Sequence, residues 1–261
     1  MCGTCGCAEE SGGTRVVMLR EEDAPDHGHP HPHPHPRPHG RRQPDGAGET
    51  VTIEQKVLAK NDLLAERNRT WMTDRGVVAV NMMSSPGAGK TTLLERTVTD
   101  LGGRRPVAVI EGDQETRLDA DRIRRTGCAV VQVNTGAGCH LDAEMMRDAL
   151  TALSPAEGSL LMVENVGNLV CPALFDLGER SKVVIISVTE GTDKPLKYPY
   201  MFAAADLILI NKSDLLPHVD FDIEQCAHHA RSVNPDVRVL TVSATTGEGL
   251  AHWYDWLAEQ R

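Results

Sequence analysis

The sequence predicts an α/β fold with a mostly parallel, seven-stranded sheet flanked by helices. Seven short runs rich in Val, Ile and Leu alternate with amphipathic segments, which is the pattern of consecutive βαβ units. The chain holds only three Trp, three Tyr and three Phe, so aliphatic side chains must build the core, as is typical of parallel sheets. A length of 261 residues suits one domain with appendages.

The first 48 residues differ from the rest of the chain. They show almost no apolar periodicity, and the run "VVML" at Val16 to Leu19 is too short to bury anything against itself. We therefore predict a flexible, disordered metal-binding arm over residues 1–48 and a folded domain over 49–261. The domain opens with a helix, because apolar residues recur near helical spacing from Thr50 onward and residues 59–71 place charges on the other face.

Strands and helices are expected to alternate along this domain. The expected strands are the runs 76–83, 106–112, 128–133, 159–165, 182–190, 206–212 and 237–244. Amphipathic helices are expected within 91–101, 115–125 and 141–153. Ligands of such sheets bind at the carboxyl ends of the strands, so the residues that follow each run are the first candidates for a site.

Charge and hydropathy exclude several classes of protein. The formal net charge is −10 and no cluster of Lys and Arg is denser than "GRR" or "RIRR", so we expect no nucleic-acid partner. The chain shows no signal-peptide pattern and no apolar run of ~20 residues, so we expect a cytoplasmic protein without membrane contact. In that reducing compartment the seven cysteines should be thiols, and a tight cluster of them indicates metal or redox chemistry.

A phosphate-binding loop follows the first strand, in the segment "SSPGAGKTTLL". Gly87 and Gly89 let the backbone N–H groups turn toward phosphate oxygens, Lys90 reaches the β- and γ-phosphates, and Thr91 can hold Mg²⁺. The strict pattern G-x-x-x-x-G-K-[ST] would have Gly where this chain has Ser84, but the Gly-Lys-Thr core is intact. The sequence therefore predicts a P-loop NTPase fold. The expected phosphate-side residues are Gly87, Ala88, Gly89, Lys90, Thr91 and Thr92.

The strand "LILINKSD" predicts which base is bound. Asp214 can accept hydrogen bonds from N1–H and the exocyclic amine of guanine, whereas adenine offers no matching pair of donors. The segment "SATTG" at Ser243 to Gly247 follows the next strand, where a second base-contacting loop belongs. The expected guanine-side residues are Asn211, Lys212, Asp214, Ser243 and Ala244.

Two carboxylates end strands that face the phosphate loop. Asp113 follows the second strand and Glu164 lies at the end of the fourth, where each can coordinate Mg²⁺ or orient the attacking water. We expect catalysis to involve Lys90, Asp113 and Glu164, with Mg²⁺ held by Thr91 and the two carboxylates. The alternatives are a helix N-cap for Asp113 and a surface turn for Glu164.

Cys139, His140 and Cys171 are candidate metal ligands inside the domain. Alone, a Cys is usually a small buried apolar group and a His a satisfied surface or core group. All three, however, follow carboxyl ends of strands, and two thiolates with an imidazole suit Zn²⁺ or Ni²⁺. A fourth ligand must come from water, a bridging thiolate or a symmetry-related chain, and the last would place the site in the seam of a two-fold dimer. We hypothesise that GTP moves Cys171 through "ENVGN" and changes metal affinity.

These motifs together resemble the HypB family, the GTPases that help to load nickel into [NiFe]-hydrogenase. The resemblance covers about residues 76–256 and the first seven residues. It rests on "SSPGAGKTTLL", "EGDQETRLDADRI", "NTGAGCHLD", "ENVGNLVCP", "GTDKPLKYP", "NKSD" and a Cys2-x-x-Cys5-x-Cys7 start. Urease-maturation GTPases are near relatives that lack this start.

The resemblance implies a P-loop GTPase of the nucleotide-dependent dimer (SIMIBI) type that uses GTP or GDP, Mg²⁺ and Ni²⁺. It implies that Asp113 and Glu164 serve the metal and the catalytic water, and that the HypA maturation protein and the hydrogenase large-subunit precursor are partners. It further implies a low-affinity metal site at Cys139, His140 and Cys171, and a tight nickel site at Cys2, Cys5 and Cys7. Homodimerisation that depends on GTP, on metal or on both is expected.

The two ends of the arm predict different metal chemistry. Three thiolates at Cys2, Cys5 and Cys7 can surround one Ni²⁺ together with an amine nitrogen, the alternative being adventitious binding. The proline-spaced histidines favour polyproline II with ~3 residues per turn, so neighbouring imidazoles point apart and weak storage is expected. Loading should fall below pH ~6.5 as the imidazoles protonate. These histidines are His27, His29, His31, His33, His35 and His39.

Three functions are compatible with this combination of nucleotide-binding motifs and metal ligands. The first is a GTP-hydrolysing metallochaperone whose turnover gates nickel release to hydrogenase. The second is a nickel storage protein with a vestigial GTPase scaffold, which the retention of the nucleotide-site residues disfavours. The third is a translation or signalling GTPase, which the metal ligands and the acidic charge disfavour. Slow intrinsic hydrolysis is expected, because the sequence shows no identifiable arginine finger.

Overall fold

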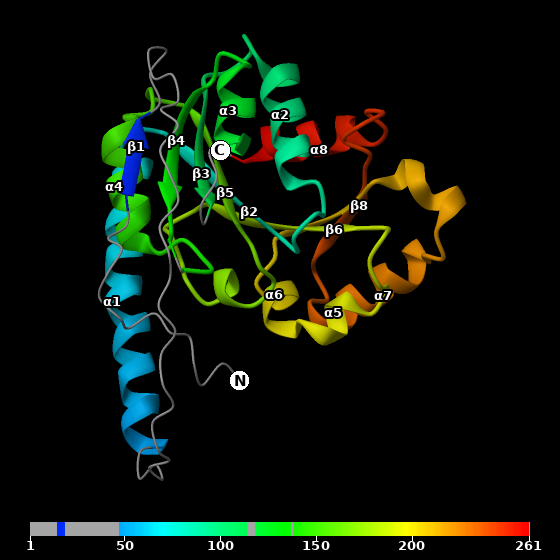
Figure 1. The fold of residues 1–261 in the computed structure, drawn as a ribbon, viewed down its shortest axis with the longest axis horizontal. Coiled ribbons are helices and arrows are strands. Elements are labelled where there is room, and N and C mark those ends of the chain that lie inside the picture. The colour runs from blue at the N-terminus through cyan, green and yellow to red at the C-terminus, as the bar shows by residue number, and fades with distance from the viewer. Residues whose placement is uncertain (1–14, 19–46, 114–117, 137, 261) are drawn as a thin grey trace, which may run out of the picture.

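The computed structural model describes residues 15–18, 47–113, 118–136 and 138–260, with side chains from residue 55 onward. Its centre is an eight-stranded sheet in the order β1-β4-β3-β5-β2-β6-β7-β8 (Figure 1). Strands β2 to β8 run parallel to one another, and β1 pairs antiparallel with β4. The strands are β1 (Arg15–Met18), β2 (Val78–Ser84), β3 (Val107–Asp113), β4 (Ala129–Asn134), β5 (Leu160–Gly167), β6 (Ser181–Ser187), β7 (Leu207–Asn211) and β8 (Arg238–Thr241).

Helices cover both faces of the sheet. The helices are α1 (Ala47–Thr73), α2 (Lys90–Leu101), α3 (Leu118–Arg124), α4 (Ala143–Leu153), α5 (Lys194–Lys197), α6 (Pro199–Ala203), α7 (Ile223–Val233) and α8 (Leu250–Glu259), with 3₁₀ turns η1 (Cys171–Ala173) and η2 (Ser213–His218). Helices α2, α3 and α8 pack on one face through side chains such as Leu93 and Trp253. On the other face, α1 and α4 pack through Met146, and α6 and α7 pack through Phe202.

Strand β2 lies near the middle of the sheet, between β5 and β6, and leads directly into α2. Strands β5 and β3 follow on one side, and β6 and β7 on the other. Every position of β2 and β7 is buried, in agreement with runs that are apolar at nearly every position. This order gathers the segments after β2, β3, β5 and β7 at one edge of the sheet, because parallel strands share a carboxyl end.

The predicted fold is confirmed, with seven parallel strands in the runs expected from the sequence. The sequence did not predict β1, which pairs four residues of the 1–48 segment with β4. A strand that joins a sheet edge through backbone hydrogen bonds needs no hydrophobic pattern of its own, so periodicity could not reveal it. The division of the chain into an arm and a domain stays a prediction, and the cysteines and histidines of the arm lie outside the described residues.

Within the described part of the chain, no helix is both long enough and apolar enough to cross a membrane.

Candidate functional site

The loop between β2 and α2 has the backbone that phosphate binding requires. Gly87 and Gly89 adopt positive φ angles of 75° and 91°, so the chain turns sharply before α2 begins at Lys90. A Cβ atom on Gly89 would lie 2.6 Å from the amide nitrogen of Asn211, so a side chain is excluded there. A glycine-rich turn that leads directly into a helix start is the geometry with which proteins bind phosphate.

Ser84 occupies the position where the strict phosphate-loop pattern has Gly. It is buried as the last residue of β2, and its hydroxyl donates to the carbonyl of Ser85 over 2.8 Å. Ser84 is not among the positions with positive φ in the described part of the chain. The local backbone therefore does not demand glycine, which explains why the pattern can tolerate serine here.

Glu164 of β5 connects the strand to the phosphate loop. Its Oε1 atom accepts hydrogen bonds from Lys90 Nζ at 2.8 Å and from Thr91 Oγ1 at 2.6 Å. Its side chain is only 2% exposed, and its Oε2 atom has no hydrogen-bond partner among the described residues. A buried, unpartnered carboxylate oxygen beside a hydroxyl fits the oxygen ligands that Mg²⁺ prefers. The structure thus brings together Lys90, Thr91 and Glu164, as the sequence predicted.

Glu111 is a site residue that the sequence reasoning missed. It pairs in register with Glu164 across β3 and β5, is almost fully buried, and has an unpartnered Oε2 atom among the described residues. Burial, reinforced by the charges of Glu164 and Asp113 and opposed by Lys90, raises the pKa of Glu111 to about 9. The available signal was a carboxylate inside the apolar run "PVAVIEG", where an unpaired charge is costly.

We expect Glu111→Gln to change how the stability of the nucleotide-free, Mg²⁺-free protein depends on pH. The unfolded carboxyl releases its proton near pH 4.5, whereas folded Glu111 keeps it to about 9. The stability that protonated Glu111 confers is therefore complete below pH 4.5 and is lost as pH rises toward 9. Glutamine mimics the protonated form at every pH. The free energy of unfolding of the variant, relative to that of the wild type, should therefore rise by about 3 kcal/mol from about pH 5.5 to about pH 8.

The measurement is the free energy of unfolding by denaturant at both pH values. Glu157→Gln is the matched control, because Glu157 is exposed in a turn. Equal pH dependence of the wild type and Glu111→Gln would contradict a protonated Glu111.

Two of the predicted guanine-side residues, Asn211 and Lys212, donate hydrogen bonds to carbonyl groups of the phosphate loop. Asn211 donates from Nδ2 to the carbonyl of Ala88 at 2.9 Å and accepts at Oδ1 from the backbone N–H of Ala244 at 3.1 Å. Lys212 donates from Nζ to the carbonyl of Gly87 at 2.6 Å. Ser243 donates from its hydroxyl to Asp214 Oδ1 at 2.6 Å, which fixes the carboxylate that we expect to contact the base.

We expect Asp214→Asn to weaken GTP binding by about 10²-fold or more, because the carboxylate would lose two charge-assisted hydrogen bonds to guanine. Xanthine has a carbonyl at position 2 where guanine has its amine, and the asparagine amide can donate to that carbonyl. Affinity for xanthosine triphosphate (XTP) should therefore rise. Competition binding with labelled GDP checks both changes. Asp220→Asn, at an exposed aspartate, is the control. Unchanged preference for GTP over XTP would contradict the role of Asp214.

The three predicted metal ligands lie together at the carboxyl ends of β4 and β5. The Sγ atoms of Cys139 and Cys171 are 2.9 Å apart, His140 Nδ1 lies 3.7 Å from Cys139 Sγ, and one ligand atom from each residue falls within 4.8 Å of the others. Asp142 caps α4 by accepting from the Met145 N–H at 2.8 Å, which fixes the segment just after His140. Two thiols and an imidazole at this spacing suit Zn²⁺ or Ni²⁺.

The imidazole of His140 is held in a form that can bind metal. Phe175 stacks on its ring with centroids 3.9 Å apart. Burial lowers the pKa of His140 below its ordinary value, while the charge of Asp142 opposes the shift. Neutral imidazole is the ligand form, so the net lowering of the pKa by burial favours metal binding near neutral pH. The sequence reasoning missed Phe175, since nothing in the local pattern marks a stacking partner.

Two further predicted residues lie at the margins of the phosphate site. Asp113 ends β3, two residues beyond Glu111, and pairs in register with Asn134 of β4. Thr92 follows Thr91 in α2, and its Oγ1 atom accepts a hydrogen bond from Arg122 at 3.3 Å. Their roles stay predictions.

The fold and the site define a P-loop nucleotide-binding protein with a Cys/His cluster beside the nucleotide edge of its sheet. Residues 78–241 match the family described as CobW/HypB/UreG, nucleotide-binding domain. The hydrogenase maturation factor HypB of Azotobacter vinelandii is 52% identical over 283 residues, covering 100% of this chain and 93% of the relative. The chain belongs to the HypB family of hydrogenase maturation factors.

Other relatives support the same assignment. HypB of Escherichia coli K12 is 56% identical over 211 residues, covering 81% of this chain and 73% of the relative. Crystal structures of HypB from Archaeoglobus fulgidus and of HypB from Helicobacter pylori in complex with nickel are 42% and 38% identical, each with a TM-score of 0.72. Each covers 77% of this chain, and the matches span 98% and 94% of the respective relatives.

Proposed function

We propose that the protein is a GTP-hydrolysing metallochaperone that delivers Ni²⁺ for insertion into a [NiFe]-hydrogenase precursor in the cytoplasm. The observation that carries this proposal is the placement of both sites on one segment. Glu164 is hydrogen-bonded to Lys90 and Thr91, and Cys171, seven residues later, lies 2.9 Å from Cys139. The nickel complex of the Helicobacter pylori relative supports nickel as the cargo.

GTP binding would rearrange the contacts of Glu164. In the described state Lys90 neutralises this carboxylate, and the β- and γ-phosphates of GTP would compete for the same ammonium group. Mg²⁺, held by Thr91 with Glu164 and Asp113, would supply positive charge to the phosphates when bound. Glu164, no longer paired with Lys90, would help to hold this Mg²⁺ or would orient the water that attacks the γ-phosphate. We expect slow hydrolysis, because the sequence shows no identifiable arginine finger to stabilise the charge that develops in the transition state.

The same rearrangement would reach the metal ligands. Asn168 links them, since its Nδ2 atom donates to the carbonyl of Cys139 at 3.4 Å and its Oδ1 atom accepts from the Val170 N–H at 2.8 Å. A shift of β5 on nucleotide binding would therefore move Cys171 relative to Cys139 and change nickel affinity. A fourth ligand from a second copy would tie nickel binding to homodimerisation.

The proposal also gives roles to the arm of residues 1–48 and to two partner proteins. Cys2, Cys5 and Cys7 would form a tight nickel site, and the histidines from His27 to His39 would store nickel weakly. The HypA maturation protein and the hydrogenase precursor would receive or exchange the metal. Zn²⁺ is the alternative occupant of the internal site.

Deleting the gene tests the proposal in the cell. We expect loss of hydrogenase activity with urease unaffected, rescue by added nickel, and rescue by the wild-type gene but not by Lys90→Ala. Nickel delivery that survives Lys90→Ala would favour a storage protein with a vestigial GTPase scaffold. Loss of urease alone would overturn the assignment of the client.

A further inference from the structure

Two adjacent residues of β5 make hydrogen bonds on opposite faces of the sheet, one with the start of α2 and the other with the residue that follows His140. Side chains alternate along a strand, so Glu164 faces α2 and Asn165 faces the side covered by α1 and α4. Glu164 accepts hydrogen bonds from the first two residues of α2. Asn165 Oδ1 accepts from the backbone N–H of Leu141 at 3.1 Å. Leu141 directly follows His140, so this pair of neighbouring residues connects the phosphate loop with the segment of a metal ligand.

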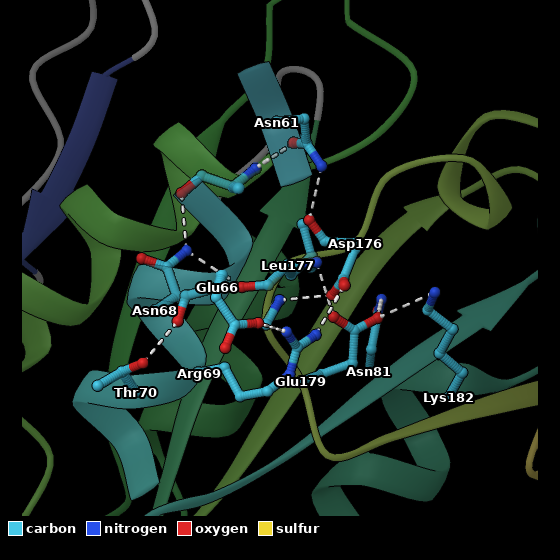
Figure 2. Close-up of polar contacts among 12 residues, drawn as sticks. Asn61, Glu66, Asn68, Arg69, Thr70, Asn81, Asp176, Leu177, Glu179 and Lys182 are labelled. Carbon is cyan, nitrogen blue, oxygen red and sulfur yellow. Dashed lines mark hydrogen bonds and ion pairs between the residues drawn. The ribbon is translucent and has the colours of Figure 1, made fainter. Parts of the chain in front are cut away.

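Asn165 also begins a series of buried side chains that are linked by hydrogen bonds. Its Nδ2 atom donates to Asn81 Oδ1 at 3.2 Å, and Asn81 Nδ2 donates to Glu179 Oε1 at 3.0 Å. Glu179 Oε2 accepts from the backbone N–H of Leu177 at 2.7 Å, and Figure 2 shows these last contacts between β2 and the loop before β6. Asn165 and Asn81 are fully buried and Glu179 is 6% exposed. Such bonds are costly to break, because water cannot replace them.

This series of hydrogen-bonded side chains is bonded at each end to one of the two segments that carry the metal ligands. One end holds Leu141, next to His140. The other end holds Leu177, two residues after Phe175, which stacks on the ring of His140. Both segments are thus hydrogen-bonded to Asn165, one directly and the other through Asn81 and Glu179, so a displacement of the end of β5 would strain the contacts of both.

A second set of asparagines joins the same two segments without touching β5. Asn61 of α1 accepts from the Ala143 N–H at 2.9 Å and donates to the Asp176 carbonyl at 2.8 Å. Asn68 donates to the carbonyls of Ala143 at 2.8 Å and Leu177 at 3.1 Å, and Figure 2 shows both asparagines projecting from α1. These contacts fix the spacing of the segments but carry no direct link to the phosphate loop, so they provide a matched structural control.

We propose that Asn165 is the positioning residue through which the nucleotide state of the phosphate loop sets the metal affinity of the Cys139–His140–Cys171 site, with Asn81 and Glu179 as the second branch. This inference rests on the proposed function, in which nickel affinity differs between nucleotide states. Asn61 and Asn68 set the resting geometry of the site, and Asn165 makes that geometry respond to nucleotide.

The test uses the full chain with Cys2, Cys5 and Cys7 replaced by Ala, so that thiolate-to-nickel absorption reports the internal site. Ni²⁺ is titrated with GDP and with a non-hydrolysable GTP analogue bound. We expect the two affinities to differ by about tenfold or more in this parent protein and by less than about twofold after Asn165→Ala. Asn61→Ala should weaken nickel binding in both states by a similar factor and keep the difference.

A second variant covers the case in which Asn165→Ala does not fold. Asn81→Ala leaves the bond from Leu141 to Asn165 in place but cuts the branch to Glu179, and it should reduce the difference between states. A difference that persists in each folded variant of Asn165 and Asn81, or that Asn61→Ala abolishes equally, would overturn the inference alone. Equal affinities in the parent protein would contradict both the inference and the proposed coupling.

Discussion

Lys90→Ala should lower the rate of GTP hydrolysis by about 10²–10³-fold, the cost typical of removing a preorganised charge from a transition state. In the described state this ammonium group lies 2.8 Å from Glu164 in a largely buried site, where its charge is weakly screened. Its loss would also leave the Glu164 carboxylate without its cation. GTP would then meet an uncompensated negative charge, so nucleotide affinity should fall as well.

Phosphate release under saturating GTP measures the rate, and titration with labelled nucleotide separates affinity from chemistry. Lys60→Ala is the matched control, because Lys60 lies on the exposed face of α1 and pairs only loosely with Glu144 at 3.4 Å. A Lys90→Ala enzyme that hydrolyses GTP at the wild-type rate would contradict the phosphate role assigned to this loop.

Cys171→Ser should weaken nickel binding at the internal site by about 100-fold or more, since changes merely next to a ligand already cost about 10–100-fold. Serine keeps the size of the side chain but replaces a soft thiolate donor by a hydroxyl that stays protonated. The absorption bands between thiolate and nickel should weaken together with the affinity. Basal GTP hydrolysis gives a check that the nucleotide site is intact.

The measurement again uses the protein in which Cys2, Cys5 and Cys7 are replaced by Ala. Cys128→Ser is the control, because Cys128 donates to the carbonyl of Val107 at the opposite end of β3 and lies outside the cluster. Nickel affinity and absorption that are unchanged in Cys171→Ser would rule out this cluster as a nickel site.

The sequence predicted features that depend on local pattern. The seven parallel strands come from apolar runs, and the phosphate loop comes from glycines that must adopt positive φ before a helix. The approach of Cys139, His140 and Cys171 also followed, because each lies after a strand of one parallel sheet.

Features that depend on contacts between distant residues could not be predicted in this way. Glu111 becomes a site residue only through its register with Glu164, 53 positions away in the chain. Asn61 and Asn165 each contact segments far along the chain, and an asparagine in a helix or strand gives no local sign of its partners. The same holds for the pairing of β1, which the edge of the sheet decides.

The most direct test of the central claim is the nickel affinity of the internal site in two nucleotide states. The site is titrated by competition with a coloured chelator, once with GDP and Mg²⁺ bound and once with a non-hydrolysable GTP analogue and Mg²⁺ bound. The account predicts affinities that differ by about tenfold or more, as coupling between sites of this kind usually gives. Equal affinities in the two states would contradict it.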